Sequence, residues 1–272
     1  MLALIAQIHW DVSPEIFHAG GFAPRWYGVL FALGLLFAYL VMKKFYREEG
    51  KPVSELDILS VYIVAGTIIG ARLGHCLFYG TSYYLSHPLE IVKFWEGGLA
   101  SHGAAIGIVL AIWLYSRKKD ISTTATWIFD RIVIVTCLAG TLIRLGNLMN
   151  SEILGTATDL PWAFVFARVD NVPRHPAQLY EAIFYLFTFF ILYNYYNKSK
   201  NKDFHGIILG MFFVIVFSFR FVIELVKEHQ SELLMNSAID MGSVLSIPFI
   251  IAGVVLILQA NRKIKNTSNK IS

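Results

Sequence analysis

The residues most able to do chemistry follow one apolar stretch near the middle of the chain. Arg144 comes at the end of that stretch, and Asn147, Asn150 and Glu152 follow it at roughly helical spacing. A fixed positive charge at the end of a hydrophobic helix is costly, but a guanidinium matches the oxygens of a phosphate well. This pattern indicates an anion site at a helix end. The alternative is an arginine that only reaches out to the membrane–water interface.

Other ionisable residues lie in or beside other apolar runs. Arg220 and Glu224 are four residues apart, so they share a helix face and could simply neutralise each other. Arg72 lies in a second run, and His102 lies in the stretch G-G-L-A-S-H-G-A at the start of a third. Because histidine titrates near neutral pH, His102 could serve as a general base, or it could be a buried histidine with satisfied hydrogen bonds. No Ser–His–Asp order and no metal-ligand spacing is present, so no metal and no cofactor is expected.

The composition places these residues in a membrane protein. The chain has 272 residues, of which 56% are hydrophobic and 15% charged, with a mean hydropathy of +0.57. A soluble domain has about 25% charged residues. The net charge of +4 is modest and no basic block is interleaved with aromatics, so nucleic acid is not an expected partner. Cys76 and Cys137 fall inside apolar runs and are expected to be packing residues, and no cleavable signal peptide is expected at residues 2–8.

The apolar runs predict an all-α, polytopic fold in the lipid bilayer. Seven of them are long enough to span, and in lipid only helices and closed barrels satisfy the backbone. The predicted spans are 26–43, 57–79, 98–116, 127–146, 178–196, 206–226 and 239–260. We expect a single membrane-embedded domain over residues 1–272, with an interfacial segment at 1–25, the helix bundle at 26–260 and a frayed polar tail at 261–272. A short interfacial helix is expected within 80–97.

Basic residues predict the orientation. Lys and Arg are concentrated after the first, third, fifth and seventh runs, which places those connections in the cytoplasm. The N-terminus is then outside and the C-terminus cytoplasmic. Nearly all ionisable groups in the spans fall in their outer halves, and Asn236 and Asp240 lie at the outer start of the last span; the exceptions are Asp130 and Arg131. This clustering predicts a shared polar cavity that opens toward the outer leaflet and binds a phospholipid, whose phosphate is the leaving group.

Small residues predict how two of the helices meet. Glycines recur every four residues in two runs, at positions that let backbones approach closely: Gly66, Gly70, Gly74, Gly103 and Gly107. Close packing of these two helices would bring Arg72 near His102.

Several motifs, in order along nearly the whole chain, give a resemblance to a family. They are R-W-Y-G at 25–28, G-A-R-L-G at 70–74, F-W-E-G-G-L-A-S-H-G at 94–103, R-L-G-N-L-M-N-S-E-I-L-G at 144–155, R-H-P-A-Q-L-Y-E at 174–181 and F-R-F-V-I-E at 219–224. The chain resembles the prolipoprotein diacylglyceryl transferases of bacterial cytoplasmic (inner) membranes. Ala104 stands where many members have a second glycine, and His75 where an aromatic residue is common.

The resemblance implies a reaction and its partners. The sn-1,2-diacylglyceryl group of phosphatidylglycerol would be transferred to the lipobox cysteine thiol beside the signal peptide of a prolipoprotein. A thioether would form and glycerol phosphate would leave, in the first step of bacterial lipoprotein maturation. His102 matches the family's essential histidine and is the candidate base, while Arg144 and Arg220 match its essential arginines and would hold the phosphate.

The resemblance also suggests roles for the surrounding residues. Tyr27 is a candidate catalytic residue, and like Asn147 and Glu152 it matches an important position. Glu224 would orient Arg220, Glu152 could orient Arg144, and Gly155 would allow a tight turn. Arg72 is a further candidate phosphate ligand, and the glycerol hydroxyls could be read by Asn147, Asn150 or Gln178.

A phospholipid or anion transporter is the alternative from another class. Alternating access calls for polar groups near the middle of the bilayer and on both sides of it, with broken helices or repeats. The one-sided polar clustering of this sequence favours the transferase.

Overall fold

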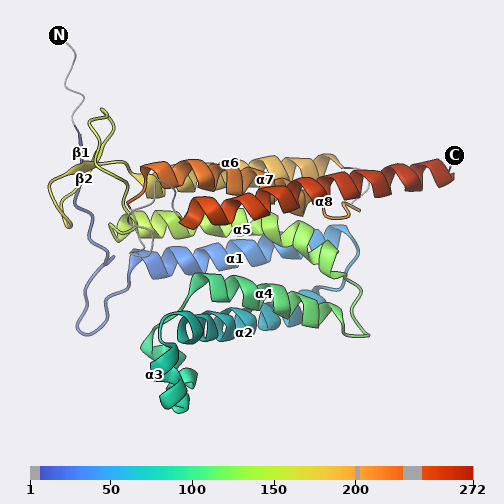
Figure 1. The fold of residues 1–272 in the computed structure, drawn as a ribbon, viewed down its shortest axis with the longest axis horizontal. Helices are drawn as coiled ribbons and strands as arrows, with labels where there is room; N and C mark the ends of the chain where they lie inside the picture. The colour runs from blue at the N-terminus through green and yellow to red at the C-terminus, as the bar shows by residue number, and fades with distance from the viewer. Residues whose placement is uncertain (1–6, 200–202, 229–240, 272) are drawn as a thin grey trace, which may run out of the picture. The chain divides into compact units, whose positions relative to one another are not determined.

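A computed structural model describes residues 7–199, 203–228 and 241–271 (Figure 1). The fold is mainly helical, in agreement with the sequence. It forms two compact units, one of residues 1–41 with 129–272 and the other of residues 42–128.

Helices occupy the seven apolar runs. They are α1 (Trp26–Glu48), α2 (Val53–Phe78), α4 (Ser101–Ser116), α5 (Ala125–Met149), α6 (Ala177–Lys198), α7 (Ile207–Ile223) and α8 (Met241–Ile271). Among the described residues, five are long and apolar enough to cross a bilayer: α1, α2, α5, α7 with the 3-10 turn η3 (Glu224–Val226), and α8. Helix α4 is shorter, and α6 carries tyrosines and asparagines among its apolar residues. The count of seven spans therefore stays a prediction.

Two helix ends differ from the predicted bounds for local reasons. Helix α4 begins at Ser101 rather than at 98, because Gly97 and Gly98 have φ of +92° and +65°, which a helix cannot include. The C-terminal tail, expected to be frayed, continues α8 as helix to Ile271, since no glycine or proline interrupts residues 254–271. The predicted start of the last span, with Asn236 and Asp240, lies outside the described residues.

In the unit of residues 42–128, α2 packs along α4. The glycine repeats meet across this contact: a Cβ on Gly66 would lie 2.6 Å from the carbonyl oxygen of Gly107, and one on Gly74 would lie 2.7 Å from the Cα of Gly103. The predicted close approach is confirmed. The connection between the two helices holds α3 (Thr81–Ser86) and the 3-10 turns η1 (Pro88–Val92) and η2 (Phe94–Glu96), so the short helix expected in 80–97 is present.

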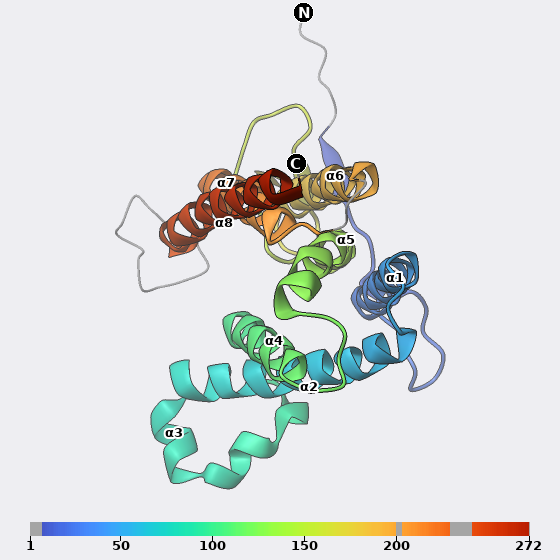
Figure 2. The same cartoon turned by 90° about the vertical axis from the view of Figure 1, so that its right-hand side faces the viewer.

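In the other unit, α6, α7 and α8 lie side by side (Figures 1 and 2). Rings and glycines fix these contacts. Phe184 of α6 stacks on Phe219 of α7 with centroids 3.7 Å apart, and a Cβ on Gly210 of α7 would lie 2.8 Å from the carbonyl oxygen of Gly253 in α8. The first part of α1 reaches α5 in the same way, because a Cβ on Gly34 would lie 3.3 Å from the Cα of Ala139.

A small sheet, which the sequence did not predict, closes one end of this unit. Strand β2 (Phe164–Phe166) pairs in parallel with β1 (Ile8–Trp10) and antiparallel with β3 (Pro173–Arg174). Its aromatic residues cover a core with Leu148 and Leu154, and the indole of Trp10 donates to the carbonyl oxygen of Leu148 at 3.0 Å. The strands are too short to show the alternation that would have predicted them. Residues 1–25, expected only to form an interfacial segment, thus also contribute β1 to this sheet.

The two charged residues at the other end of α5 have a structural role. Asp130 accepts the backbone N–H groups of Gly206 and Leu209 at 2.8 and 3.0 Å, which caps the start of α7. Arg131 is buried with its guanidinium over the rings of Tyr196 and Phe204. These contacts explain why this pair departs from the one-sided pattern. The two cysteines are buried and free, as expected of packing residues.

Candidate functional site

Arg144 is held from one side by a carboxylate of the neighbouring helix. Its Nε lies 3.1 Å from Oε2 of Glu181 in α6, and its Nη1 donates to Oδ1 of Asn147 at 3.4 Å. The Nε–H does not point at Oε2, so the contact is an ion pair without an aligned hydrogen bond. Among the described residues, Nη2 makes no hydrogen bond. The outer edge of the guanidinium is therefore available for a ligand.

Glu152 reaches Arg144 only indirectly. Its Oε1 accepts the side-chain amides of Asn147 at 2.8 Å and of Asn150 at 3.3 Å. Asn147 in turn accepts from Arg144, so it relays the contact. The sequence suggested Glu152 as the residue that orients Arg144; the structure gives the direct ion pair to Glu181 instead.

Buried oxygens without donors gather around Glu152. Gln178 is fully buried and donates from Nε2 to the backbone oxygen of Glu152 at 2.6 Å. Within the described part of the chain, its Oε1 has no hydrogen bond, nor has Oδ1 of Asn150 or the hydroxyl of Ser151. Buried polar atoms are normally satisfied. These oxygens therefore suit a ligand that donates hydrogen bonds.

Gly155 is required by close approach and not by a turn. A Cβ there would collide with the carbonyl oxygen of His175 and would lie 2.8 Å from that of Val226. The left-handed positions nearby are Ser151 and Ile153, with φ of +53° and +59°. The tight turn that the sequence assigned to Gly155 thus belongs to the residues before it.

The closeness at Gly155 ties the end of α5 to the end of α7. Gly155 forms an antiparallel bridge with Lys227, flanked by hydrogen bonds from Thr156 N to Val226 O at 2.9 Å and from Glu228 N to Leu154 O at 3.1 Å. This pairing fixes the backbone of Lys227 beside the Arg144 segment.

Arg220 is held in the same manner as Arg144. Its Nε lies 3.6 Å from Oε1 of Glu224, which confirms the predicted pairing on one helix face. Half of the Arg220 side chain is exposed, at 50%, whereas Glu224 is 14% exposed. Each arginine thus has a carboxylate at Nε.

Two buried residues complete an unbroken chain of charges between the arginines. Nζ of Lys227 lies 3.7 Å from Oε1 of Glu181 and 3.8 Å from Oε1 of Glu224. The order is Arg144, Glu181, Lys227, Glu224, Arg220. We call these five residues the charge chain.

Two members of the charge chain, Glu181 and Lys227, were not assigned a role from the sequence, although signals existed. Glu181 lies three residues after Gln178, on the same face of α6. Lys227 lies three residues after Glu224, one turn beyond the pair of Arg220 and Glu224.

Tyr27 packs next to the Arg144 segment. It lies at the start of α1, where a Cβ on Gly146 would be 2.9 Å from its ring. Gly146 follows Arg144 by two residues, so the missing side chain makes room for the tyrosine. Tyr27, Arg144, Asn147, Asn150, Glu152, Gly155, Gln178, Arg220 and Glu224 all belong to the same unit.

Arg174 of β3 centres a second ion-pair group, which supports the backbone at Gly155. Arg174 pairs with Asp170 through Nη2 at 2.6 Å and with Glu228, and its Nη1 donates to the carbonyl oxygen of Gly155 at 3.4 Å. The hydrogen bond from Arg174 lowers the pKa of Asp170 below its ordinary value. The same contacts raise the pKa of Arg174.

His102 and Arg72 belong to the unit of residues 42–128. His102 is exposed at the start of α4, where its ring packs edge-on against Phe78 at 5.1 Å and lies 5.9 Å from the ring of Tyr79. In the described part of the chain its ring nitrogens have no hydrogen-bond partner. Whichever ring nitrogen is unprotonated is therefore free to accept a proton.

Arg72 is occupied by backbone carbonyls. It is buried and donates to Glu90 O and Gly97 O at 2.6 Å each and to Ile91 O at 3.0 Å. These bonds use most of its N–H groups to hold the loop before α4. Its predicted role as a phosphate ligand stays a prediction, and the structure gives it a loop-holding role.

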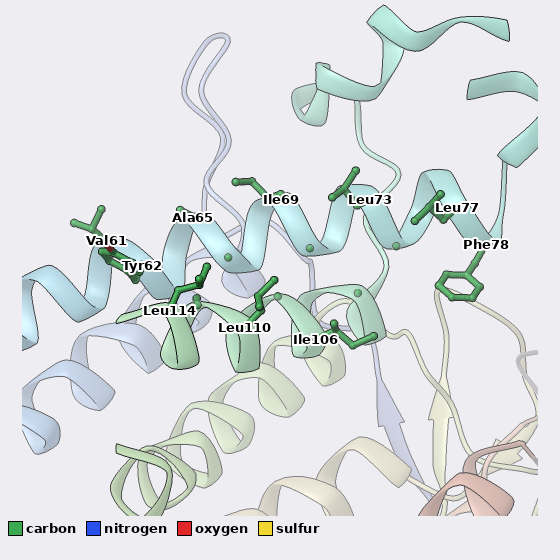
Figure 3. Close-up of a pocket in the computed structure, with 16 residues that line it drawn as sticks. Val61, Tyr62, Ala65, Ile69, Leu73, Leu77, Phe78, Ile106, Leu110 and Leu114 are labelled. Atoms are coloured by element: carbon green, nitrogen blue, oxygen red, sulfur yellow. The ribbon is translucent and has the colours of Figure 1, made fainter. Parts of the chain in front are cut away.

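An apolar groove of about 600 Å³ runs along α2 and α4 (Figure 3). Ridges of Ile69, Leu73 and Leu77 on one side and Leu110 and Leu114 on the other line it, and the glycines lie between them. Its lining offers hydrocarbon chains a surface but offers a headgroup almost nothing polar.

Comparisons with known proteins agree with one another. A family model described as "Prolipoprotein diacylglyceryl transferase" matches residues 14–259. The chain is 47% identical to a phosphatidylglycerol–prolipoprotein diacylglyceryl transferase of Tolumonas auensis, over 93% of this chain and 97% of the relative. It is 48% identical to one of Chloroherpeton thalassium, over 94% and 95%, and 42% identical to one of Bacteroides fragilis, over 96% and 98%.

Proposed function

The chain belongs to the prolipoprotein diacylglyceryl transferase family, and we propose that it transfers the diacylglyceryl group of phosphatidylglycerol to a prolipoprotein. The acceptor is the thiol of the lipobox cysteine beside the signal peptide. The enzyme spans the bacterial cytoplasmic membrane seven times, with the N-terminus outside, the C-terminus in the cytoplasm and the reaction at the outer leaflet. The whole chain works as one membrane-embedded domain.

One observation carries the chemistry: two arginines of the charge chain are each held at Nε by a carboxylate. A guanidinium held at Nε keeps its two Nη groups for a bidentate contact with phosphate oxygens. Arg144 and Arg220 bind the phosphate of the lipid in this way. They also stabilise the charge that grows on the phosphate as it leaves.

The reaction is a displacement at carbon. His102 takes the proton of the acceptor thiol, whose ordinary pKa of about 8.5 leaves little thiolate at neutral pH. The sulfur attacks the carbon of the diacylglyceryl group that is bonded to the phosphate oxygen, and not the carbon of the free headgroup glycerol. A C–S bond forms as the C–O bond breaks, and the electron pair leaves on the phosphate oxygen of glycerol phosphate.

The buried oxygens near Glu152 support recognition of the headgroup. The free glycerol of phosphatidylglycerol has two hydroxyl donors, and Oε1 of Gln178 and Oδ1 of Asn150 are acceptors without a donor among the described residues. Asn147 supports these groups through Glu152, and Tyr27 lines the same segment. A lipid whose headgroup lacks such hydroxyls would leave these acceptors unpaired, which is costly.

The direct test is a transfer assay with the purified protein. The enzyme is incubated with phosphatidylglycerol and a lipobox peptide, and mass spectrometry follows the peptide. We expect a gain of one diacylglyceryl group on the cysteine and release of glycerol phosphate, with no gain on a peptide that has serine in place of the cysteine. No lipid gain on the cysteine peptide would refute the transferase.

Three variants test the assigned roles. R144K keeps the positive charge but loses the planar guanidinium with its two Nη groups. We expect kcat/KM for the lipid to fall about 10- to 100-fold, which corresponds to the free energy of one hydrogen bond to a charged group. R168K is the matched control, because Arg168 is exposed, and its activity should stay unchanged. H102Q should lower kcat at least about 100-fold; full activity would remove His102 as the base.

A further inference from the structure

Glu181 and Lys227 are the second and third members of the charge chain, counted from Arg144, and both are buried. Their side chains are 5% and 8% exposed. A buried charge is expensive unless it is paired, and removing one partner leaves the other uncompensated. Glu181 in α6 and Lys227 after α7 therefore each depend on the other for charge compensation.

The two oxygens of Glu181 serve different cations. Oε2 lies 3.1 Å from Nε of Arg144, and Oε1 lies 3.7 Å from Nζ of Lys227. The closest approach to Arg144 is thus made by one oxygen, while the other oxygen faces Lys227. With both oxygens, a carboxylate can form the bidentate pair with an arginine that a phosphate also forms.

Lys227 also contacts Glu224, the carboxylate that pairs with Arg220. Its Nζ shares Oε1 of Glu224 with Nε of Arg220, at 3.8 and 3.6 Å. Its backbone is fixed by the bridge to Gly155. The lysine is thus held where it restrains the carboxylates of both arginines.

We propose that Glu181 and Lys227 are positioning residues for the phosphate of the lipid substrate. Glu181 orients Arg144 by its Nε, and Lys227 restrains Glu181 so that this carboxylate does not compete with phosphate for the Nη groups. Lys227 also couples Arg144 to Arg220 through Glu224. The inference rests on the proposed function, because it assigns the phosphate to these arginines.

We expect the defects of the two substitutions in lipid binding not to multiply when they are combined. In K227M, Glu181 is released to form a bidentate pair with Arg144 and becomes a competitor of the phosphate. In E181Q, the neutral amide no longer orients Arg144 as strongly. The double variant E181Q/K227M has no competing carboxylate, so its defect should be no greater than that of K227M alone.

The experiment measures two quantities on the full-length protein in detergent. One is the dissociation constant of phosphatidylglycerol by native mass spectrometry, and the other is kcat and KM for lipid and for lipobox peptide. Each single variant should weaken lipid binding and raise KM for the lipid roughly tenfold to a hundredfold, within the usual coupling of residues in one network. KM for the peptide should stay unchanged, and K227R should recover most of the loss.

Controls separate positioning from folding. E48Q removes a carboxylate that pairs with Lys44 at 3.6 Å elsewhere in α1, and it should bind and react as the wild type does. Thermal unfolding of every variant reports the folded fraction, for which activities are corrected.

Two results would overturn the inference. One is a double variant whose defect equals the product of the two single defects, and the other is single variants with wild-type lipid binding. A wild type that binds phosphatidylglycerol but transfers nothing would instead overturn the proposed function, while the double-mutant cycle in lipid binding would still decide the roles of Glu181 and Lys227.

Discussion

Substituting Gly155 by alanine should damage both stability and activity. The added methyl group would collide with the carbonyl oxygen of His175 and lie 2.8 Å from that of Val226. Both contacts are with backbone, so no flexible side chain can move away. The bridge between residues 154–156 and 226–228 must open, and it carries the hydrogen bonds Thr156 N to Val226 O and Glu228 N to Leu154 O.

The magnitude follows from these contacts. Overpacking of a closely packed site costs about 1–3 kcal/mol. In a chain of this size, each kcal/mol lowers Tm by roughly 2–4 °C, so the expected fall is on the order of 2–12 °C. The loss of activity should exceed the loss that unfolding alone explains, because Lys227 is displaced from Glu181 and Glu224.

The assay compares G155A with a matched glycine variant. A Cβ on Gly21 meets nothing within 4 Å, and its φ is not in the left-handed region, so G21A is the control. Thermal unfolding in detergent and the peptide-transfer assay are run on both. If G155A keeps the wild-type Tm and the wild-type kcat/KM, the bridge does not hold Lys227 in place and the reasoning is wrong.

Three further predictions concern other contacts. R72M should loosen the loop before α4, because four backbone carbonyls lose their donor, and limited proteolysis within 87–98 should become faster; equal cleavage rates would contradict the loop-holding role. G70L should separate α2 from α4 and lower Tm by several degrees, since a side chain there meets the backbone of Gly107 at 2.8 Å; an unchanged Tm would argue against the tight contact. The ion pair with Arg174 lowers the pKa of Asp170 in the folded protein, so its stabilisation is present above the ordinary aspartate pKa of about 3.9 and is lost as pH falls through the lower folded value. The protection factor of the Val172 amide, which donates to Asp170 at 3.0 Å, should fall over that acid range in the wild type but not in D170N.

Much of the fold could be predicted because its signals are local. Runs of apolar residues in a chain with few charges predict helices wherever they occur, and every predicted run contains one. The glycine repeats of α2 and α4 predicted their close contact for the same reason, since a four-residue period marks one helix face. The pairing of Arg220 with Glu224 also follows from spacing on a single helix.

The sheet and the true partner of Arg144 could not be found in this way. Strand β2 meets β1 and β3 through short segments far apart in sequence, with no alternation long enough to read. Glu181 reaches Arg144 from another helix, and nearby Glu152 was the closer candidate along the chain. Contacts between elements depend on helix rotation and register, which composition does not encode.

The sequence by itself predicted which residues carry the chemistry: arginines and a histidine in apolar helices, where charges persist only for a reason. The tertiary structure decided how the arginines are held. Because α6 and the segment after α7 converge on the end of α5, Glu181 and Lys227 join Arg144 to Arg220 in one chain of charges. Periodicity can place a residue on a face of its own helix, but only packing between helices brings the opposite charge to it.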